Sequence, residues 1–255
     1  MIGRIYWIAL NTVIEFVRDR SVTGFLFIGI LFILGGAVVA DLSFVEKQKM
    51  YIDTGLGAIF IVSVFITLLA GTNVIDRELR EKQALCALAK PIPRAAWMAG
   101  KFAGYLFTLG AVIFLLTSFF FFYIKLQVGL WIPMIFVGGL FIYLEMIVLS
   151  SYILLFSMIT SQYMSLFFAL LVLIIGHMID DLKIYWASGS EAARFITHAL
   201  FYVLPNMKTY LATPIVNGNI PVPSNYVIAL LCSTTLYVLI AGILAGLLLN
   251  RKELA

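Results

Sequence analysis

Six long runs of apolar residues dominate this sequence, and they restrict what the chain can fold into. They cover residues 22–40, 55–73, 102–124, 131–158, 163–179 and 226–249, and Glu145 is the only charged residue inside them. A helix of about 20 apolar residues rises 1.5 Å per residue and so crosses a hydrocarbon core of about 30 Å. The sequence therefore predicts an all-α membrane protein with six transmembrane helices in one domain, residues 1–255.

The composition excludes a water-soluble protein. Hydrophobic residues make up 63% of the chain and charged residues 12%, whereas soluble domains average about 45–50% and about 25%. The net charge of +4 does not indicate a nucleic-acid partner, because excess Lys and Arg in a membrane protein ordinarily reflects its topology.

The distribution of Lys and Arg predicts the orientation. Eleven of the 17 basic residues fall in the N-terminal segment, in the connection between spans two and three, and in the C-terminal tail. Six spans place these three regions on one side, and the positive-inside rule makes that side cytoplasmic. Both termini should then be cytoplasmic, and residues 180–225 should form an extracytoplasmic segment.

Two segments outside the spans show a pattern of their own. In residues 1–20, Arg4, Asn11, Glu15 and Arg18 form a narrow polar stripe at helical spacing, which predicts an interfacial helix in the headgroup plane. An irregular leader that merges into the first span is the alternative. In the outer segment, residues 192–204 predict a short helix, and 213–224 are rich in Pro, Gly and Asn and predict a surface loop.

The connection at residues 74–97 is highly charged. Charges alternate from Asp76 to Lys82, with oppositely charged residues four apart, and Pro91 and Pro93 then stop the helix. Taken alone, this pattern describes an ordinary helical loop. The order of residues adds more: Arg77-Glu78, a small apolar helix, Ala-Lys-Pro-Ile-x-Arg ending at Arg94, and Gly-Lys before the next span.

This order, together with the six-span topology, resembles the ABC-2 type transporter permeases, and most closely their branch named for multicopper-enzyme maturation. The resemblance implies that residues 74–97 hold a cytoplasmic coupling helix, which docks on a separate ATPase subunit present in two copies. It also implies a second permease subunit, and we expect the two subunits to form a homodimer. It further implies transport in the export direction and a location in the inner membrane of a prokaryote. The coupling interface would comprise Arg77, Glu78, Arg80, Glu81, Lys82 and Arg94.

The chain lacks the Gly-x4-Gly-Lys-[Ser/Thr] phosphate loop, so ATP and Mg²⁺ are expected on the partner ATPase and this chain is not expected to be an enzyme. No cofactor is predicted for it. A stand-alone secondary transporter or channel is the alternative, although such a protein should carry polar groups in several spans.

Glu145 is the clearest candidate for a functional residue inside a span. An intramembrane carboxyl ordinarily faces protein or a water-filled cavity. Two roles stay open for Glu145: a structural hydrogen bond between helices, or a place at a gate or dimer seam. His177, Asp180 and Asp181 follow helical spacing and are interpreted as a polar helix end rather than a metal site.

Overall fold

The computed structural model of the chain describes residues 2–41, 47–80, 94–129, 131–186, 204–218 and 220–251, and every regular element in them is a helix. The elements in chain order are α1 (Ile2–Arg18), α2 (Arg20–Asp41), α3 (Lys47–Arg80), α5 (Arg94–Val128), α6 (Met134–Ile159), α7 (Gln162–Trp186), the short 3-10 helix η1 (Met207–Tyr210), α9 (Thr213–Asn217) and α10 (Ser224–Arg251).

Six of these helices, α2, α3, α5, α6, α7 and α10, are long and apolar enough to cross a membrane. The prediction of six spans in an all-α membrane protein is thus confirmed. Two helices are much longer than the apolar runs that predicted them, α3 with 34 residues and α5 with 35. Backbone hydrogen bonding continues beyond the lipid, where charged side chains can be hydrated, so a helix need not end where its apolar run ends.

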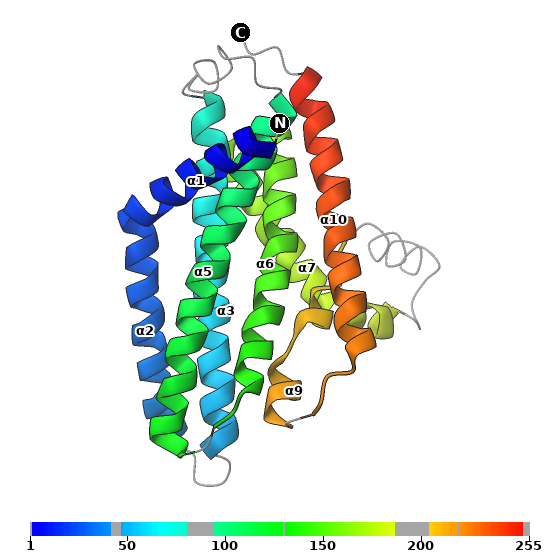
Figure 1. Cartoon of the computed structure of the whole chain (residues 1–255). Coiled ribbons are helices and arrows are strands. Elements are labelled where there is room, and N and C mark those ends of the chain that lie inside the picture. Colours follow the sequence, from blue (N-terminus) through cyan, green and yellow to red (C-terminus); the bar gives the residue numbers. More distant parts are fainter. Residues whose placement is uncertain are drawn as a thin grey trace.

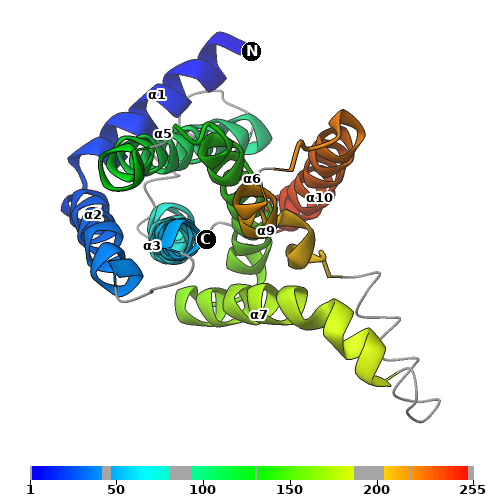
Figure 2. The same cartoon turned by 90° about the horizontal axis from the view of Figure 1, so that it is seen from below.

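The spans form a bundle around α6 (Figures 1 and 2). In the most apolar stretch of α6, 67% of the residues are buried. In the corresponding stretches of α2 and α10, which lie at the periphery, 18% and 17% of the residues are buried. Helix α7 leans strongly away from the bundle axis, since it is seen from the side where α2 and α3 are seen nearly end-on (Figure 2). We call the end where α1 begins and α10 finishes the terminal end, and the opposite end the α9 end (Figure 1).

Helix α1 is a separate helix that lies across α5 near the terminal end (Figure 1). Asp19 marks the break, because its carboxylate accepts a hydrogen bond from the Ser21 N–H at 2.8 Å and so caps the start of α2. Gly104 permits close contact between α1 and α5, since a Cβ there would lie 2.5 Å from the Ala9 carbonyl oxygen. The amphipathic helix predicted here is present, and its place in the headgroup plane stays a prediction.

Most of the buried hydroxyls described in the spans bond to carbonyls of their own helices. Ser63 donates to the Ile59 carbonyl at 2.7 Å, and Ser150 donates to the Met146 carbonyl at 2.6 Å. A hydroxyl bonded to the carbonyl one turn earlier needs no partner helix and no water, so such residues are tolerated in an apolar bundle. These serines therefore mark no polar path through the membrane.

The non-spanning segments agree only in part with the sequence predictions. Residues 74–80 belong to the end of α3, and 81–93 lie outside the described residues, so the separate coupling helix stays a prediction. The helix predicted at 192–204 also falls almost entirely outside them. The loop predicted at 213–224 was wrong at its start: Thr213–Asn217 form α9, and Val216 is buried with 1% of its surface exposed. Pro214 lies in the first turn of α9, where its missing N–H costs nothing.

Candidate functional site

Glu145 lies near the middle of α6, within the helix bundle of a single chain. It is about 16 Å from Met134 and about 21 Å from Ile159 at 1.5 Å per residue. Its side chain is 2% exposed, so it faces protein, as expected of an intramembrane carboxyl. Its Oε1 atom has no hydrogen-bond partner among the described residues. A role at a gate or dimer seam stays a prediction.

A histidine of α7 lies close to Glu145. The Nε2 atom of His177 lies 3.4 Å from Glu145 Oε1, within ion-pair distance but without the alignment of a good hydrogen bond. The other ring nitrogen, Nδ1, lies 3.1 Å from the Leu173 carbonyl oxygen. The ring also meets the Phe60 ring of α3 edge-on, with centroids 5.8 Å apart. Three helices, α3, α6 and α7, therefore hold this pair.

A segment that we call the cap, Leu204–Gly218, packs over α7 and enters the bundle. It contains η1 and α9, and Met207, Tyr210 and Val216 are buried. Gly176, one residue before His177, makes the close packing feasible: a Cβ there would lie 2.6 Å from Met207 Cγ and 2.8 Å from the Pro205 carbonyl oxygen. The cap thus covers α7 beside the buried pair.

Polar contacts hold the cap to the surrounding helices. Asn206 Nδ2 donates to Asp180 Oδ2 at 2.8 Å, and Asn217 Nδ2 donates to Asp53 Oδ1 of α3 at 2.6 Å. The Lys208 ammonium lies 2.8 Å from Asp181 Oδ1, and this carboxylate raises the pKa of Lys208 above its ordinary value. The Lys208 pair is exposed, so it contributes little to stability, whereas the two asparagine contacts are partly buried.

Four of the six predicted coupling residues belong to described helices and lie at the terminal end. The backbone places Arg77, Glu78 and Arg80 in the last turns of α3, and Arg94 is the first residue of α5. Glu81 and Lys82 lie outside the described residues. The segment that the resemblance singled out is thus flanked directly by the two longest helices of the structure.

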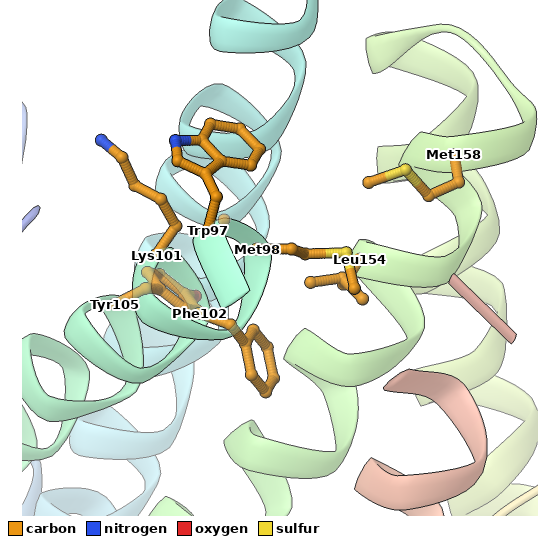
Figure 3. A pocket seen from close by; sticks show the side chains of 8 residues that line it. Trp97, Met98, Lys101, Phe102, Tyr105, Leu154 and Met158 are labelled. Carbon is orange, nitrogen blue, oxygen red and sulfur yellow. The ribbon is translucent and has the colours of Figure 1, made fainter. Parts of the chain in front are cut away.

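The first turns of α5 are anchored to the bundle. Met98 points from α5 toward Leu154 and Met158 of α6, beside a small cavity of about 20 Å³ (Figure 3). Trp97 and Met98 are 7% and 8% exposed and share an apolar cluster with α6 and α10. Lys101 points the other way in Figure 3, and its Nζ atom lies 2.9 Å from Glu15 Oε2 of α1. The first turns of α5 are therefore in contact with α1, α6 and α10.

The sequence did not reveal the partner of Glu145. His177 was interpreted as part of a polar helix end with Asp180 and Asp181, whereas its ring reaches inward to α6. The sequence signal that could have indicated this contact was the position of His177 inside the apolar run at residues 163–179. The part of the chain that the structure describes contains no group of three or more His, Cys, Asp or Glu residues that could hold a metal ion.

No protein-family model matches this chain, and no curated protein matches it. A functional assignment therefore rests on the geometry of these two regions, the buried Glu145–His177 pair and the terminal end of α3 and α5, together with the resemblance at residues 74–101.

Proposed function

We propose that this protein is the membrane-spanning permease subunit of an ATP-binding cassette transporter, in which a separate ATPase acts on residues 74–97. The observation that carries the proposal is the length of the two helices flanking this segment. At 1.5 Å per residue α3 is about 51 Å long and α5 about 52 Å long, against a hydrocarbon core of about 30 Å. Both helices run without interruption from the charged segment into the bundle.

A force applied to this segment would reach the whole bundle. Helix α3 packs against α2, α5, α6 and α7, and the first turns of α5 contact α6, α10 and α1. Rigid helices transmit a displacement along their length, and tightly packed interiors pass it to their neighbours. This mechanical continuity supports a role in which ATP hydrolysis on a partner rearranges the spans.

In this proposal, the other subunits of the transporter are separate chains. Two ATPase subunits would bind ATP and Mg²⁺, because this chain has no phosphate loop. A second permease subunit, in our proposal another copy of this chain, would complete the path for an exported substrate. The protein would lie in the inner membrane of a prokaryote with both termini cytoplasmic, as the basic residues suggest.

A stand-alone secondary transporter is the second candidate, and one observation favours it. Such transporters use ionisable groups buried near the middle of the membrane, and Glu145 with His177 is a pair of this kind. The two candidates differ in whether a separate ATPase is required.

Capture of the ATPase distinguishes the two candidates. The tagged chain is purified from its native membrane, and co-purifying proteins are tested for a phosphate-loop ATPase and for ATP hydrolysis. Glu78→Lys should reduce capture of the ATPase, because losing one partner of a desolvated interfacial ion pair costs about 2–5 kcal/mol, roughly 30-fold or more in affinity. Insertion of the permease should be unchanged.

The matched control is Lys49→Glu, a charge reversal on α3 at the α9 end, which should leave capture of the ATPase at the wild-type level. Wild-type levels of both capture and transport in Glu78→Lys would exclude Glu78 as a coupling contact. If no ATPase accompanies the wild-type chain under conditions that preserve other membrane complexes, the permease proposal fails and the stand-alone transporter replaces it.

A further inference from the structure

The hydrogen-bonding chemistry of the Glu145–His177 pair depends on which ring nitrogen of His177 carries a proton. Nδ1 lies 3.1 Å from the Leu173 carbonyl oxygen, and a carbonyl oxygen can only accept a hydrogen bond. Nδ1 must therefore carry hydrogen for this bond to exist. In a neutral imidazole the second nitrogen, Nε2, then has a lone pair and no proton.

That tautomer has a consequence for Glu145. With a neutral ring and an ionised carboxylate, the lone pair of Nε2 would face the negatively charged Oε1 at 3.4 Å, and neither atom could donate. One additional proton resolves this conflict. The proton either sits on the carboxyl, which then donates to Nε2, or sits on Nε2, which then donates to the carboxylate. In both arrangements the net charge of the pair rises from −1 to 0.

Among the described residues, the basic side chain within ion-pair distance of Glu145 is that of His177. Oε1 has no hydrogen-bond partner among the described residues, and no Asp, Glu, Lys or Arg occurs in α5 between Lys101 and Lys125 or in α10 before Arg251. The ionisable side chains described on the elements around α6 are, besides His177, Lys47, Lys49, Tyr51 and Asp53 on α3, Lys101, Tyr105, Tyr123 and Lys125 on α5, Tyr143 and Tyr152 on α6, Tyr163, Asp180, Asp181 and Lys183 on α7, Lys208 and Tyr210 in the cap, and Tyr226, Cys232 and Tyr237 on α10. An unpaired carboxylate at this depth is unfavourable, so the pair favours the protonated state.

Polar groups of α7 and the cap connect the pair to the α9 end. His177 is 27% exposed; Asp180 lies one turn farther along α7 and binds Asn206, and Asp181 with Lys208 is exposed. Toward the terminal end, the buried polar residues of α6 are three serines, and each hydroxyl is bonded to a backbone carbonyl or to Ser165. Serines bonded in this way offer no titratable group.

We propose that Glu145 and His177 form a proton-binding site inside the membrane, which takes its proton from water at the α9 end of the bundle. His177 is the group that exchanges protons with this end, and Glu145 is the buried group whose charge changes. One proton is bound per chain, between Glu145 Oε1 and His177 Nε2. The site does not depend on the proposed ATPase, and it would serve an ATP-driven permease or a stand-alone transporter alike.

Nitrogen NMR of histidine tests the proposal directly, because the chain has two histidines. The whole chain, labelled with ¹⁵N-histidine, is reconstituted in lipid and titrated between about pH 5 and pH 9, which brackets the ordinary imidazole range. The His177 signals, identified by their loss in His177→Gln, should show Nδ1 carrying hydrogen, and their titration curve should shift in Glu145→Gln. Because Glu145→Gln removes the negative charge that the bound proton neutralises, proton uptake by the site should move to lower pH in this variant. The matched control, His198→Gln, should leave the His177 curve unchanged.

The side of access is tested in sealed vesicles in which all chains have one orientation. Changing the pH on the side of the α9 end should move the His177 signals, and changing it on the terminal side should not. A His177 curve identical in wild type and Glu145→Gln would overturn the site. A response to the terminal side alone would overturn the proposed access.

If Glu145→Gln does not fold, infrared spectroscopy provides a second measurement. A carboxyl C=O stretch that titrates in wild type and moves in His177→Gln would support the pair, and a spectrum identical in both proteins would refute it. Neither measurement involves an ATPase, so this proposal and the proposed function can fail separately.

Discussion

At the scale of single residues, the structure shows how an ionisable side chain can be kept inside an apolar bundle. A charged side chain at the centre of a membrane helix costs about 2.5–3.5 kcal/mol on insertion scales. Glu145 is 2% exposed and lies 3.4 Å from His177, so a shared proton would neutralise the pair and offset most of that cost. Ser150 and Ser151 of the same helix need no such arrangement, because their hydroxyls bond to carbonyls one turn away.

A substitution at Asn206 should loosen the cap in a pH-dependent way. Asn206 accepts from the Lys208 N–H at 3.1 Å and donates to Asp180 at 2.8 Å. Asn206→Asp keeps the acceptor but places a carboxylate against Asp180, and losing this partly buried hydrogen bond costs about 1 kcal/mol. Backbone amides of residues 206–210 should exchange with deuterium faster at neutral pH. Protection should return in acid, because protonating one carboxyl restores a donor.

The control for Asn206→Asp is Asn11→Asp, the same change at an exposed position on α1, which should leave exchange in the cap unaltered. Faster exchange in Asn206→Asp that does not recover in acid would show that repulsion between carboxylates is not its cause.

At the scale of elements, α1 and α5 form one unit. Their contact has an apolar part, with Phe16 of α1 against Tyr105 of α5 at a centroid distance of 5.6 Å, and an ionic part, Glu15 with Lys101. The ionic part is exposed on the Glu15 side and worth about 0–1 kcal/mol, so the close approach at Gly104 decides how tightly the helices pack. Through α5, this unit continues to the charged segment at 81–93.

Gly104→Val should separate α1 from α5. A Cβ at position 104 would lie 2.5 Å from the Ala9 carbonyl oxygen and 2.8 Å from Thr12 Cβ, and overpacking of this kind costs about 1–3 kcal/mol. Thermal unfolding in detergent should move to lower temperature by several degrees. Gly57→Val is the matched control, because no described heavy atom lies within 4 Å of its Cβ position, and it should unfold near the wild-type temperature. Equal stability of the two variants would show that α1 does not pack on α5 in this way.

At the scale of the whole molecule, the two ends of the bundle differ in chemistry. The terminal end brings together α1, the projecting ends of α3 and α5, and the end of α10, whereas the α9 end carries the cap with its acidic and amide contacts (Figure 1). The cap is held by contacts to α3 and α7 and by the bond between Tyr210 and Thr234 of α10 at 2.9 Å. One end is thus formed by helix termini, and the other by the polar contacts of the cap.

Labelling of cysteines in intact cells tests which end faces outward. Ile220 is 54% exposed at the α9 end, so Ile220→Cys in a Cys232→Ser background should react with a membrane-impermeant maleimide. Cys86, which lies outside the described residues in the predicted coupling segment, should react only after the cells are permeabilised. The reverse pattern would invert the orientation and place residues 74–97 outside, beyond the reach of a cytoplasmic ATPase.

The sequence alone was sufficient to predict the six spans and the α1 helix, because both predictions depend on local properties: the length of an apolar run and the spacing of polar residues along one helix. It was also sufficient to predict that Glu145 faces protein rather than lipid, because the free-energy cost of exposing a carboxyl group to lipid does not depend on the fold. It did not predict that α3 would continue to Arg80, because charged residues end a membrane span without ending a helix.

The tertiary structure decided the features that depend on contacts between residues far apart in the sequence. Glu145 and His177 are 32 positions apart in the chain, and only the tilt of α7 against α6, with Gly176 admitting the cap, brings His177 Nε2 to 3.4 Å from the carboxyl. The cap could not be predicted either, because Asn206 and Asn217 appear in sequence as ordinary loop residues and find Asp180 and Asp53 only through folding. Composition and periodicity describe one helix at a time, whereas a site between helices depends on their crossing, which packing sets.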